Sequence, residues 1–534
     1  MQKLISLGIT LILAFPVMAQ ASERKSPNVL FLAVDDWNDW VGCLGADRVQ
    51  TPNMDRLAQM GVLFTQAYTA SPLCNPSRTA IMSGLRPSTT GVYENAQPGP
   101  ACVPKDHKML PEYFRDNGYY TVGVGKIYHD WIGMTSPKEW DEYYLWNELG
   151  RQYGWFMNYS MHPCPLPDER PVNQITSKTK RNFDWAGLSY PEEAWPDHKC
   201  ASYAVKFLEE EHDQPFFLAV GMFRPHVPWF APQKYFDQYP LDKIDTPPYL
   251  EGDTEDIPDP AKKLALTGAS KHHLVKEYGE WKKAIQAYQA CISFSDAQLG
   301  RVLDALEKSP QKDNTIIVLW SDHGYHLGEK DHWHKRTLWE RATHVPLIVV
   351  APGITSEGGK CNQPVDLMAV YPTLLELAGL PGNVTIIGEG ESLVPLLKDQ
   401  GMEWEKPALM TYGYNNHAVR SQHFRYIRYA DGSEELYDHR KDPNEWDNLA
   451  GDADYKKVIE AHRKWLPENN SKEGPSYYKG DVLFNPETFE WKRKEEVNGN
   501  PDFHHALELK KECNAKSARI VEWWMPDGYE PSIY

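Results

Sequence analysis

The fold class of this 534-residue chain is indicated most clearly by the stretch Asn28-Val29-Leu30-Phe31-Leu32-Ala33-Val34, which Asp35-Asp36 follow directly. An apolar run of this length, without alternating polar residues, is typical of a strand buried on both faces of a parallel sheet. Similar runs occur at 120–124, 216–222, 315–320 and 345–350. Between them, residues 54–60 and 284–306 are predicted to be amphipathic helices. The alternation predicts an α/β fold with a large, mostly parallel sheet that helices cover on both faces.

Charged and imidazole side chains follow four of these predicted strands. They are Asp35 and Asp36, Lys126 and His129, Arg224 and His226, and Asp322 and His323. Ligands of open parallel sheets bind outside the carboxyl ends of strands, so we expect these side chains at one rim. Three carboxylates close together repel one another unless a cation lies between them, so Asp35, Asp36 and Asp322 imply a bound metal ion. Oxygen ligands favour Ca²⁺ or Mg²⁺, and His323 leaves the identity of the metal open.

The segment Cys74-Asn75-Pro76-Ser77-Arg78-Thr79-Ala80-Ile81-Met82-Ser83-Gly84 is the most specific pattern in the chain. Pro76 suits the first turn of a helix, which places Cys74 at the amino end, where backbone N–H groups and the helix dipole favour an anion. Arg78, one turn further, can turn its guanidinium toward the same anion. From these residues alone, Cys74 is either a thiolate nucleophile or a buried cysteine.

Cys-x-Pro-Ser-Arg followed by Gly84 resembles the signature of the sulfatase family, in which a maturation enzyme oxidises the cysteine to formylglycine. The resemblance continues at 51–55, 125–129, 224–228, 320–329, 343–347 and 434–438. It implies an alkaline-phosphatase-like fold with a smaller C-terminal antiparallel-sheet subdomain. Within the family, the spacing of Lys126 and His129, the presence of His323, and residues 416–420 look most like the iduronate-2-sulfatase group.

The resemblance also implies how the site would work. One Ca²⁺, or Mg²⁺, would be held by Asp35, Asp36, Asp322, His323 and position 74. The hydrated formylglycine made from Cys74 would attack the sulfur in line and expel the sugar hydroxyl, and loss of sulfate would regenerate the aldehyde.

Five further residues receive catalytic roles by the same resemblance. Arg78, Lys126 and Lys335 would neutralise the sulfate oxygens. His226 would protonate the leaving alcohol, and His129 would take the proton of the hydrate in the elimination step.

The expected substrate is a sulfated oligosaccharide, with a 2-O-sulfated iduronate or other uronate residue as the favoured target. Tyr414, His417 and Arg420 are predicted to contact the sugar, and Arg420 could bind a uronate carboxylate. Sulfated ulvan, carrageenan or fucan are alternative substrates. Two rival functions are a phosphomonoester or phosphonate hydrolase, which shares the fold, and a sugar-binding protein whose Cys74 is never matured.

The beginning of the chain predicts export. An apolar stretch at 4–18 precedes Ala19-Gln20-Ala21, a small-x-small pattern typical of signal-peptide cleavage, so residues 1–21 are predicted to be a signal peptide. We expect a secreted or periplasmic protein without a membrane span.

The catalytic domain is predicted at 22–400, and a C-terminal α+β subdomain with a charged tail at 401–534. Strands are expected within 418–429 and at 434–438, a helix at 454–465, and loops over 130–201.

Charge and cysteine content limit the remaining possibilities. The net charge is −18 without clustered Lys and Arg, which argues against nucleic-acid binding. The eight cysteines have no zinc-type spacing. Export would permit one disulfide among Cys102, Cys164 and Cys200.

Overall fold

The computed structural model describes residues 26–129, 133–144, 175, 183–266, 272–381, 389–497 and 499–509. The predicted signal peptide at 1–21 and Cys164 lie outside these residues. Within the described ranges, no helix has both the length and the apolar character needed to cross a membrane.

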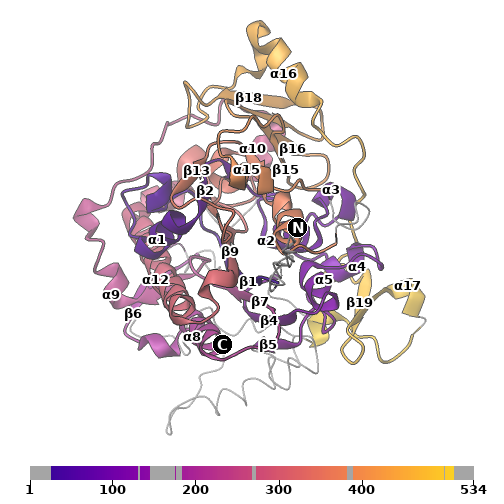
Figure 1. The fold of residues 1–534 in the computed structure, drawn as a ribbon. Helices are drawn as coiled ribbons and strands as arrows, with labels where there is room; N and C mark the ends of the chain where they lie inside the picture. The colour runs from indigo at the N-terminus through magenta and orange to yellow at the C-terminus, as the bar shows by residue number, and fades with distance from the viewer. Residues whose placement is uncertain are drawn as a thin grey trace, which may run out of the picture.

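An eight-stranded sheet forms the middle of the molecule (Figure 1). In pairing order its strands are β13 (Gly359–Cys361), β2 (Val62–Phe64), β12 (Leu347–Val350), β9 (Thr315–Ser321), β1 (Asn28–Val34), β7 (Phe216–Gly221), β4 (Tyr120–Gly125) and β5 (Glu142–Tyr144). β1 pairs in parallel with β7 and β9, and β4 pairs in parallel with β7 and β5. The predicted α/β fold with a mostly parallel sheet is confirmed.

β12 is the exception, because it runs antiparallel to both β9 and β2. A parallel pairing needs a long crossover, usually a helix that runs back along the sheet. The longest helix between β9 and β12 is the four-residue α13 (Glu340–Thr343). Residues 322–346 therefore leave from and return to the same rim, where β1 also ends. The strand expected at 345–350 begins two residues later, after Pro346, which has no N–H for the ladder.

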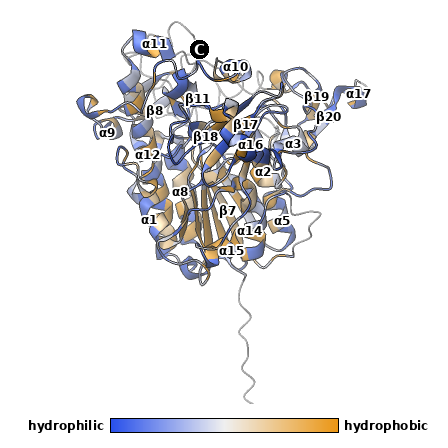
Figure 2. Cartoon of the chain, turned by 90° about the horizontal axis from the view of Figure 1, so that it is seen from above, coloured by the Kyte–Doolittle hydropathy of each residue, from blue (hydrophilic) through white to orange (hydrophobic). Residues whose placement is uncertain are grey.

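Helices cover both faces of the sheet (Figure 2). On one face pack α1 (Pro52–Met60), α8 (Pro196–Glu209) and α12 (Trp281–Lys308). On the other face pack α2 (Cys74–Ser83), α5 (Leu110–Asp116) and α14 (Val370–Leu377). The helices predicted at 54–60 and 284–306 are confirmed, with α12 slightly longer at both ends.

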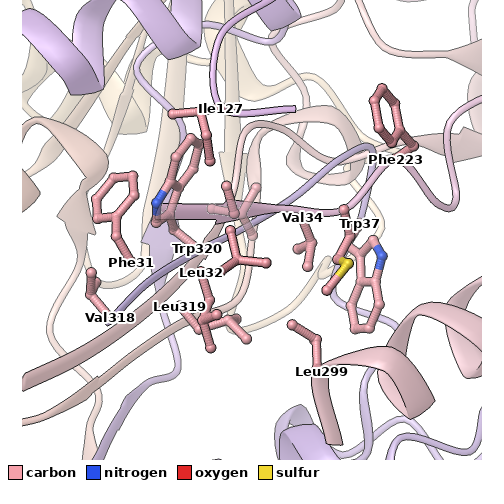
Figure 3. Close-up of a cluster of buried hydrophobic side chains, with 14 of the residues drawn as sticks. Phe31, Leu32, Val34, Trp37, Ile127, Phe223, Leu299, Val318, Leu319 and Trp320 are labelled. Carbon is pink, nitrogen blue, oxygen red and sulfur yellow. The ribbon is translucent and has the colours of Figure 1, made fainter. Parts of the chain in front are cut away.

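Aromatic side chains fix the central strands relative to one another (Figure 3). The ring centroid of Phe31 on β1 lies 5.4 Å from that of Trp320 on β9 and 5.5 Å from that of Phe217 on β7. All three side chains are buried. Replacing a buried aromatic residue by alanine typically costs about 3–5 kcal/mol of stability. This packing therefore stabilises the alignment of β1 with β7 and β9.

A second, four-stranded antiparallel sheet lies above the first in Figure 1. Its strands are β15 (Ala408–Thr411), β16 (His417–Arg420), β17 (Phe424–Arg428) and β18 (Glu434–Asp438), followed by α16 (Lys456–Arg463). The segment predicted at 418–429 is thus two strands joined by a short turn. The helix expected at 454–465 is shorter because a 3-10 turn at Ala453–Tyr455 precedes it. The domain boundary at residue 400 stays a prediction.

The chain after α16 returns to the large domain. The backbone N–H groups of Ser471, Gly474 and Tyr477 donate to the carbonyl oxygens of Ser88, Gly91 and Ala96, at 2.7, 2.8 and 3.0 Å. The following hairpin, β19 (Val482–Asn485) and β20 (Glu490–Arg493), lies near α4 (Gly99–Cys102) (Figure 1). This returning tail therefore braces residues 88–97, which comprise most of the short helix α3 (Pro87–Thr90) and the loop after it.

The region expected to form loops, 130–201, contains regular structure where it is described. β5 adds an edge strand to the main sheet, β6 (Trp185–Leu188) pairs with β8 (Trp229–Pro232), and α8 begins at Pro196. The prediction of loops is wrong at these positions, because short strands without alternation and a helix opened by proline leave a weak periodic signal. Cys102 and Cys200 are free thiols, so no disulfide joins them.

Candidate active site

Cys74 is the first residue of α2, and only 1% of its side chain is exposed. The residue before it, Leu73, is extended, so the chain turns abruptly into the helix at the predicted position. The Sγ atom lies 3.2 Å from Nε2 of His323, 3.4 Å from Nζ of Lys335 and 3.9 Å from Oδ1 of Asp35. The structure therefore brings together three segments that are far apart in the sequence.

Asp35, Asp36, Cys74 and His323 each offer one ligand atom, and these atoms all lie within 4.8 Å of one another. The two carboxylates end β1, and His323 follows β9. Asp36 has a positive φ of 64°, which the surroundings must hold in place. The hydroxyl of Tyr288 donates to the Asp36 carbonyl oxygen at 2.7 Å, a contact that sequence reasoning gave no reason to expect.

Two observations show that this cluster fits a bound cation. Within the described residues, Oδ2 of Asp36 is buried without any hydrogen-bond partner, as expected of an atom reserved for a metal ion. Nδ1 of His323 donates to the carbonyl oxygen of Gly324 at 3.1 Å, so Nε2, which faces the cluster, is the nitrogen that would give up its proton to bind a cation. Two of the four ligand atoms are carboxylate oxygens, which favour a hard divalent cation.

Asp322 lies beside this group of four rather than within it. Its Oδ1 accepts the backbone N–H of Asp36 at 3.1 Å, and its Oδ2 accepts Nε of Arg78 at 2.8 Å. The Oδ2 atom is 3.6 Å from Nε2 of His323. Both oxygens thus have protein donors, and the role of Asp322 as a metal ligand stays a prediction.

Arg78 is fully buried and contacts the protein's own carboxylates and carbonyl groups, and its role toward sulfate oxygens stays a prediction. Besides Asp322, it reaches Oδ1 of Asp35 at 3.4 Å and the carbonyl oxygens of Lys126 and Ile127. The guanidinium also lies over the ring of Trp320. Because these groups occupy its donors, Arg78 orients the carboxylates in this structure.

Lys126 and Lys335 neutralise the carboxylates from the two sides of the cluster. Nζ of Lys126 donates to Oδ2 of Asp35 at 2.5 Å, and Nζ of Lys335 donates to Oδ1 of Asp36 at 2.6 Å. Both lysines are buried. Ammonium groups in these positions can bind the oxygens of an anionic ligand that enters the cluster.

The charges around position 74 favour an anion there. Burial opposes ionisation of the thiol, but Lys335, Lys126 and His323 outweigh it and hold the pKa of Cys74 well below its usual value. Burial also opposes protonation of His323, yet Asp322 and the Cys74 thiolate raise the pKa of this imidazole to about 9. The site is therefore built to stabilise a negatively charged nucleophile.

The two predicted acid–base histidines both lie at this site. His129 lies close enough to Cys74 to contribute to the lowered pKa of the thiol. His226 is partly buried, and its charge acts on Asp35. Nδ1 of His226 donates to the carbonyl oxygen of Val227 at 2.7 Å, so Nε2 is the atom that can transfer a proton.

The three predicted sugar-binding residues are placed very differently. Tyr414 is 42% exposed, and its ring lies 6.1 Å from that of Tyr93. His417 is buried and bonds through Nδ1 to Oγ1 of Thr411 at 3.0 Å. Arg420 is also buried, and its Nε donates to Glu340 at 3.2 Å. Arg420 thus already pairs with an internal carboxylate, and its contact with a uronate carboxylate stays a prediction.

Arg336 is a residue at this rim that sequence reasoning missed. Its Nη1 donates to Oε2 of Glu94 at 3.1 Å and to the hydroxyl of Tyr412 at 3.2 Å. The only sequence feature that could have indicated Arg336 was its position directly after Lys335. A basic residue in a loop is usually solvated, so the sequence could not distinguish Arg336 from an ordinary surface arginine.

Comparisons with known proteins agree with this geometry. The model of the Sulfatase family matches residues 27–380, and the model described as N-sulphoglucosamine sulphohydrolase, C-terminal, matches residues 328–472. A Sulfatase of Formosa agariphila is 44% identical over 84% of this chain and 88% of its own. Iduronate 2-sulfatase of Homo sapiens is 31% identical over 76% of this chain and 80% of its own. The solved structure of a 2-O GAG sulfatase is 25% identical with a TM-score of 0.61, over 82% of this chain and 91% of that one.

Proposed function

Because the chain belongs to the sulfatase family, we propose that it removes the 2-O-sulfate from iduronate or other uronate residues of oligosaccharides derived from sulfated polysaccharides. The family assignment makes the chain a hydrolase of sulfate esters. One observation carries this function: Asp35, Asp36, Cys74 and His323 converge within 4.8 Å at a rim lined by Lys126 and Lys335.

Support for a 2-O-sulfated uronate comes from two of the similar proteins. One is named for action on iduronate 2-sulfate, and the other is described as a 2-O GAG sulfatase. The relative with the higher identity is named only for sulfatase activity, so sulfated ulvan, carrageenan and fucan belong in the same substrate panel.

The family generally uses formylglycine and a metal ion, and the residues present fit both. Asp35, Asp36 and His323 would hold the cation together with position 74, with Asp322 as a predicted fifth protein ligand. We propose Ca²⁺, with Mg²⁺ as the alternative. When bound, such a cation supplies positive charge that polarises the oxygens it contacts.

The protein's own residues would then bind the ester and move the protons. Lys126 and Lys335, now paired with carboxylates, can turn their ammonium groups toward the sulfate oxygens. Nε2 of His226 can protonate the departing sugar oxygen, because the Val227 carbonyl fixes the other ring nitrogen as a donor. His129, whose side chain contributes to the lowered pKa of Cys74, would remove a proton from the group at position 74.

The proposal includes export and maturation. Residues 1–21 would direct the chain out of the cytoplasm, to the periplasm or the medium, and would be cleaved after Ala21. A formylglycine-generating enzyme would act on Cys74. The amino-terminal sequence and the compartment of the protein recovered from its native host test the export proposal.

The central test combines mass spectrometry with sulfate release. In protein purified from a host able to mature it, the peptide containing position 74 should be lighter by about 18 Da, as conversion of a thiol to an aldehyde requires. The same preparation should release sulfate from a 2-O-sulfated uronate disaccharide faster than from sulfated ulvan, carrageenan or fucan fragments. Preferential hydrolysis of a phenyl phosphonate monoester would favour the phosphonate hydrolase instead. An unmodified thiol in protein from the native source, without sulfate release, would favour a sugar-binding protein.

A further inference from the structure

We propose that Arg336 binds the carboxylate of the uronate ring and thereby determines substrate specificity; this inference rests on the function proposed for the Cys74 site. Arg336 directly follows Lys335, whose Nζ lies 3.4 Å from Sγ of Cys74. Its backbone N–H donates at 3.0 Å to the carbonyl oxygen of Pro72, two residues before Cys74. The backbone of Arg336 is thus held next to Cys74 by its covalent neighbour Lys335 and by its hydrogen bond to Pro72.

The guanidinium of Arg336 is held at one edge only. Nη1 donates to Glu94 and to the hydroxyl of Tyr412, and Glu94 is itself fixed because its carbonyl oxygen accepts Nδ2 of Asn75 at 3.1 Å. Within the described part of the chain, Nε and Nη2 make no hydrogen bond. These two donors form the edge of an arginine that binds a carboxylate in a bidentate manner.

Exposure separates Arg336 from the other cations considered for this site. Its side chain is 26% exposed, whereas the side chains of Arg78, Lys126, Lys335 and Arg420 are 0%, 0%, 2% and 5% exposed. A 2-O-sulfated uronate carries two anions, and its sulfate must enter the buried cluster. The carboxylate is attached at another position of the ring, so it lies nearer the solvent than the sulfate does. A cation at the mouth of the site suits it better than a buried one.

The backbone explains how neighbouring residues reach different depths. His334 and Arg336 have positive φ angles of 107° and 78°, a conformation that residues other than glycine rarely adopt. These two residues flank Lys335. The resulting turn sends Lys335 inward to Asp36 and leaves Arg336 partly exposed.

The test compares three substrates with the matured protein. They are a 2-O-sulfated uronate disaccharide, the same disaccharide with its carboxylate reduced to an alcohol, and a simple aryl sulfate. Arg336→Met should raise KM for the first substrate about tenfold to a hundredfold, because a charge-assisted bidentate pair is lost. The kcat/KM values for the other two should change less than about twofold. Tyr412→Phe should shift KM in the same direction by a smaller factor.

Arg463→Met is the matched control, because it breaks an exposed arginine–carboxylate pair, with Glu434, on the small domain. This variant should hydrolyse all three substrates with the same KM and kcat/KM as the unsubstituted protein. Equal losses on all three substrates with Arg336→Met, or no loss on any, would overturn the inference. If the wild-type protein hydrolyses the native and the reduced disaccharide equally well, the carboxylate subsite fails while the sulfatase function stands. If it hydrolyses neither disaccharide but cleaves the aryl sulfate, the proposed uronate substrate fails, and this inference fails with it.

Discussion

Nζ of Lys335 lies 3.4 Å from Sγ of Cys74, although 261 positions separate the two residues in the sequence. The antiparallel direction of β12 explains the contact. Because residues 322–346 leave β9 and re-enter the sheet at the same rim, the segment carrying Lys335 must lie over the end of β1. The convergence of the carboxylates, Cys74 and the neighbouring lysines therefore follows from the strand order as well as from the sequence motifs.

A divalent cation should stabilise the protein through the carboxylate cluster. A ligand at a hundred times its Kd stabilises the folded state by about 2.7 kcal/mol. We therefore expect Ca²⁺ to raise the Tm of chelator-treated protein by a few degrees, as followed by differential scanning calorimetry. Asp36→Asn should abolish this increase, because it removes a ligand with an unpaired oxygen. Asp141→Asn, which alters a carboxylate paired with Arg115, should keep it; an equal Tm increase in both variants would place the cation elsewhere.

His226→Gln should slow sugar sulfates far more than activated esters. A general acid contributes about 10²- to 10⁴-fold when the leaving alcohol is a poor one. We expect kcat for the sulfated disaccharide to fall by that factor, and kcat for a nitrophenyl sulfate, whose phenolate leaves unaided, to fall less than about tenfold. Steady-state kinetics on both substrates measures the difference. Equal losses would assign His226 to binding.

Glu139 should make the protein less stable as the pH rises. It is buried and accepts the backbone N–H of Ser136 at 2.8 Å, and burial raises its pKa from 4.5 to about 8. A carboxyl group whose pKa is higher in the folded state stabilises that state fully below pH 4.5, and this contribution disappears as the pH rises through about 8. Urea denaturation between pH 5 and pH 9 should show a falling midpoint. In Glu139→Gln, which cannot ionise, this fall should be smaller, and an unchanged pH profile would assign it to other groups.

Gly91→Ala should detach the returning tail. Gly91 has a φ of +74°, and an added Cβ would lie 2.4 Å from the carbonyl oxygen of Lys472. Positive φ alone costs an alanine about 1–2 kcal/mol. Gly379→Ala is the control, because Gly379 has a φ of +66° with nothing within 4 Å of the added atom. We expect limited proteolysis to cut within 469–481 in Gly91→Ala only; equal protection in both variants would contradict the tail contact.

The sequence was sufficient for the parts of the site that depend on strand ends. Asp35, His129 and His323 each follow a buried strand, and parallel strands deliver their carboxyl ends to one rim. Arg420 shows the limit of that reasoning. Its partner, Glu340, comes 80 residues earlier, so nothing local indicated that the guanidinium would be neutralised inside the protein. The sequence also could not show that β12 runs antiparallel to its neighbours, because an apolar run of residues does not indicate the direction in which the strand pairs.

The tail contact also sets an order of events during synthesis. Ser471 donates its hydroxyl to the carbonyl oxygen of Thr89, and 382 positions lie between them. At about 5–20 residues per second, the ribosome needs roughly 20 to 80 s to make the chain between those two residues. Throughout that interval, residues 88–97, which follow the helix that begins at Cys74, lack their contacts with the tail. The maturation enzyme proposed above would have this period in which to reach Cys74, before the last segment of the chain packs against residues 88–97.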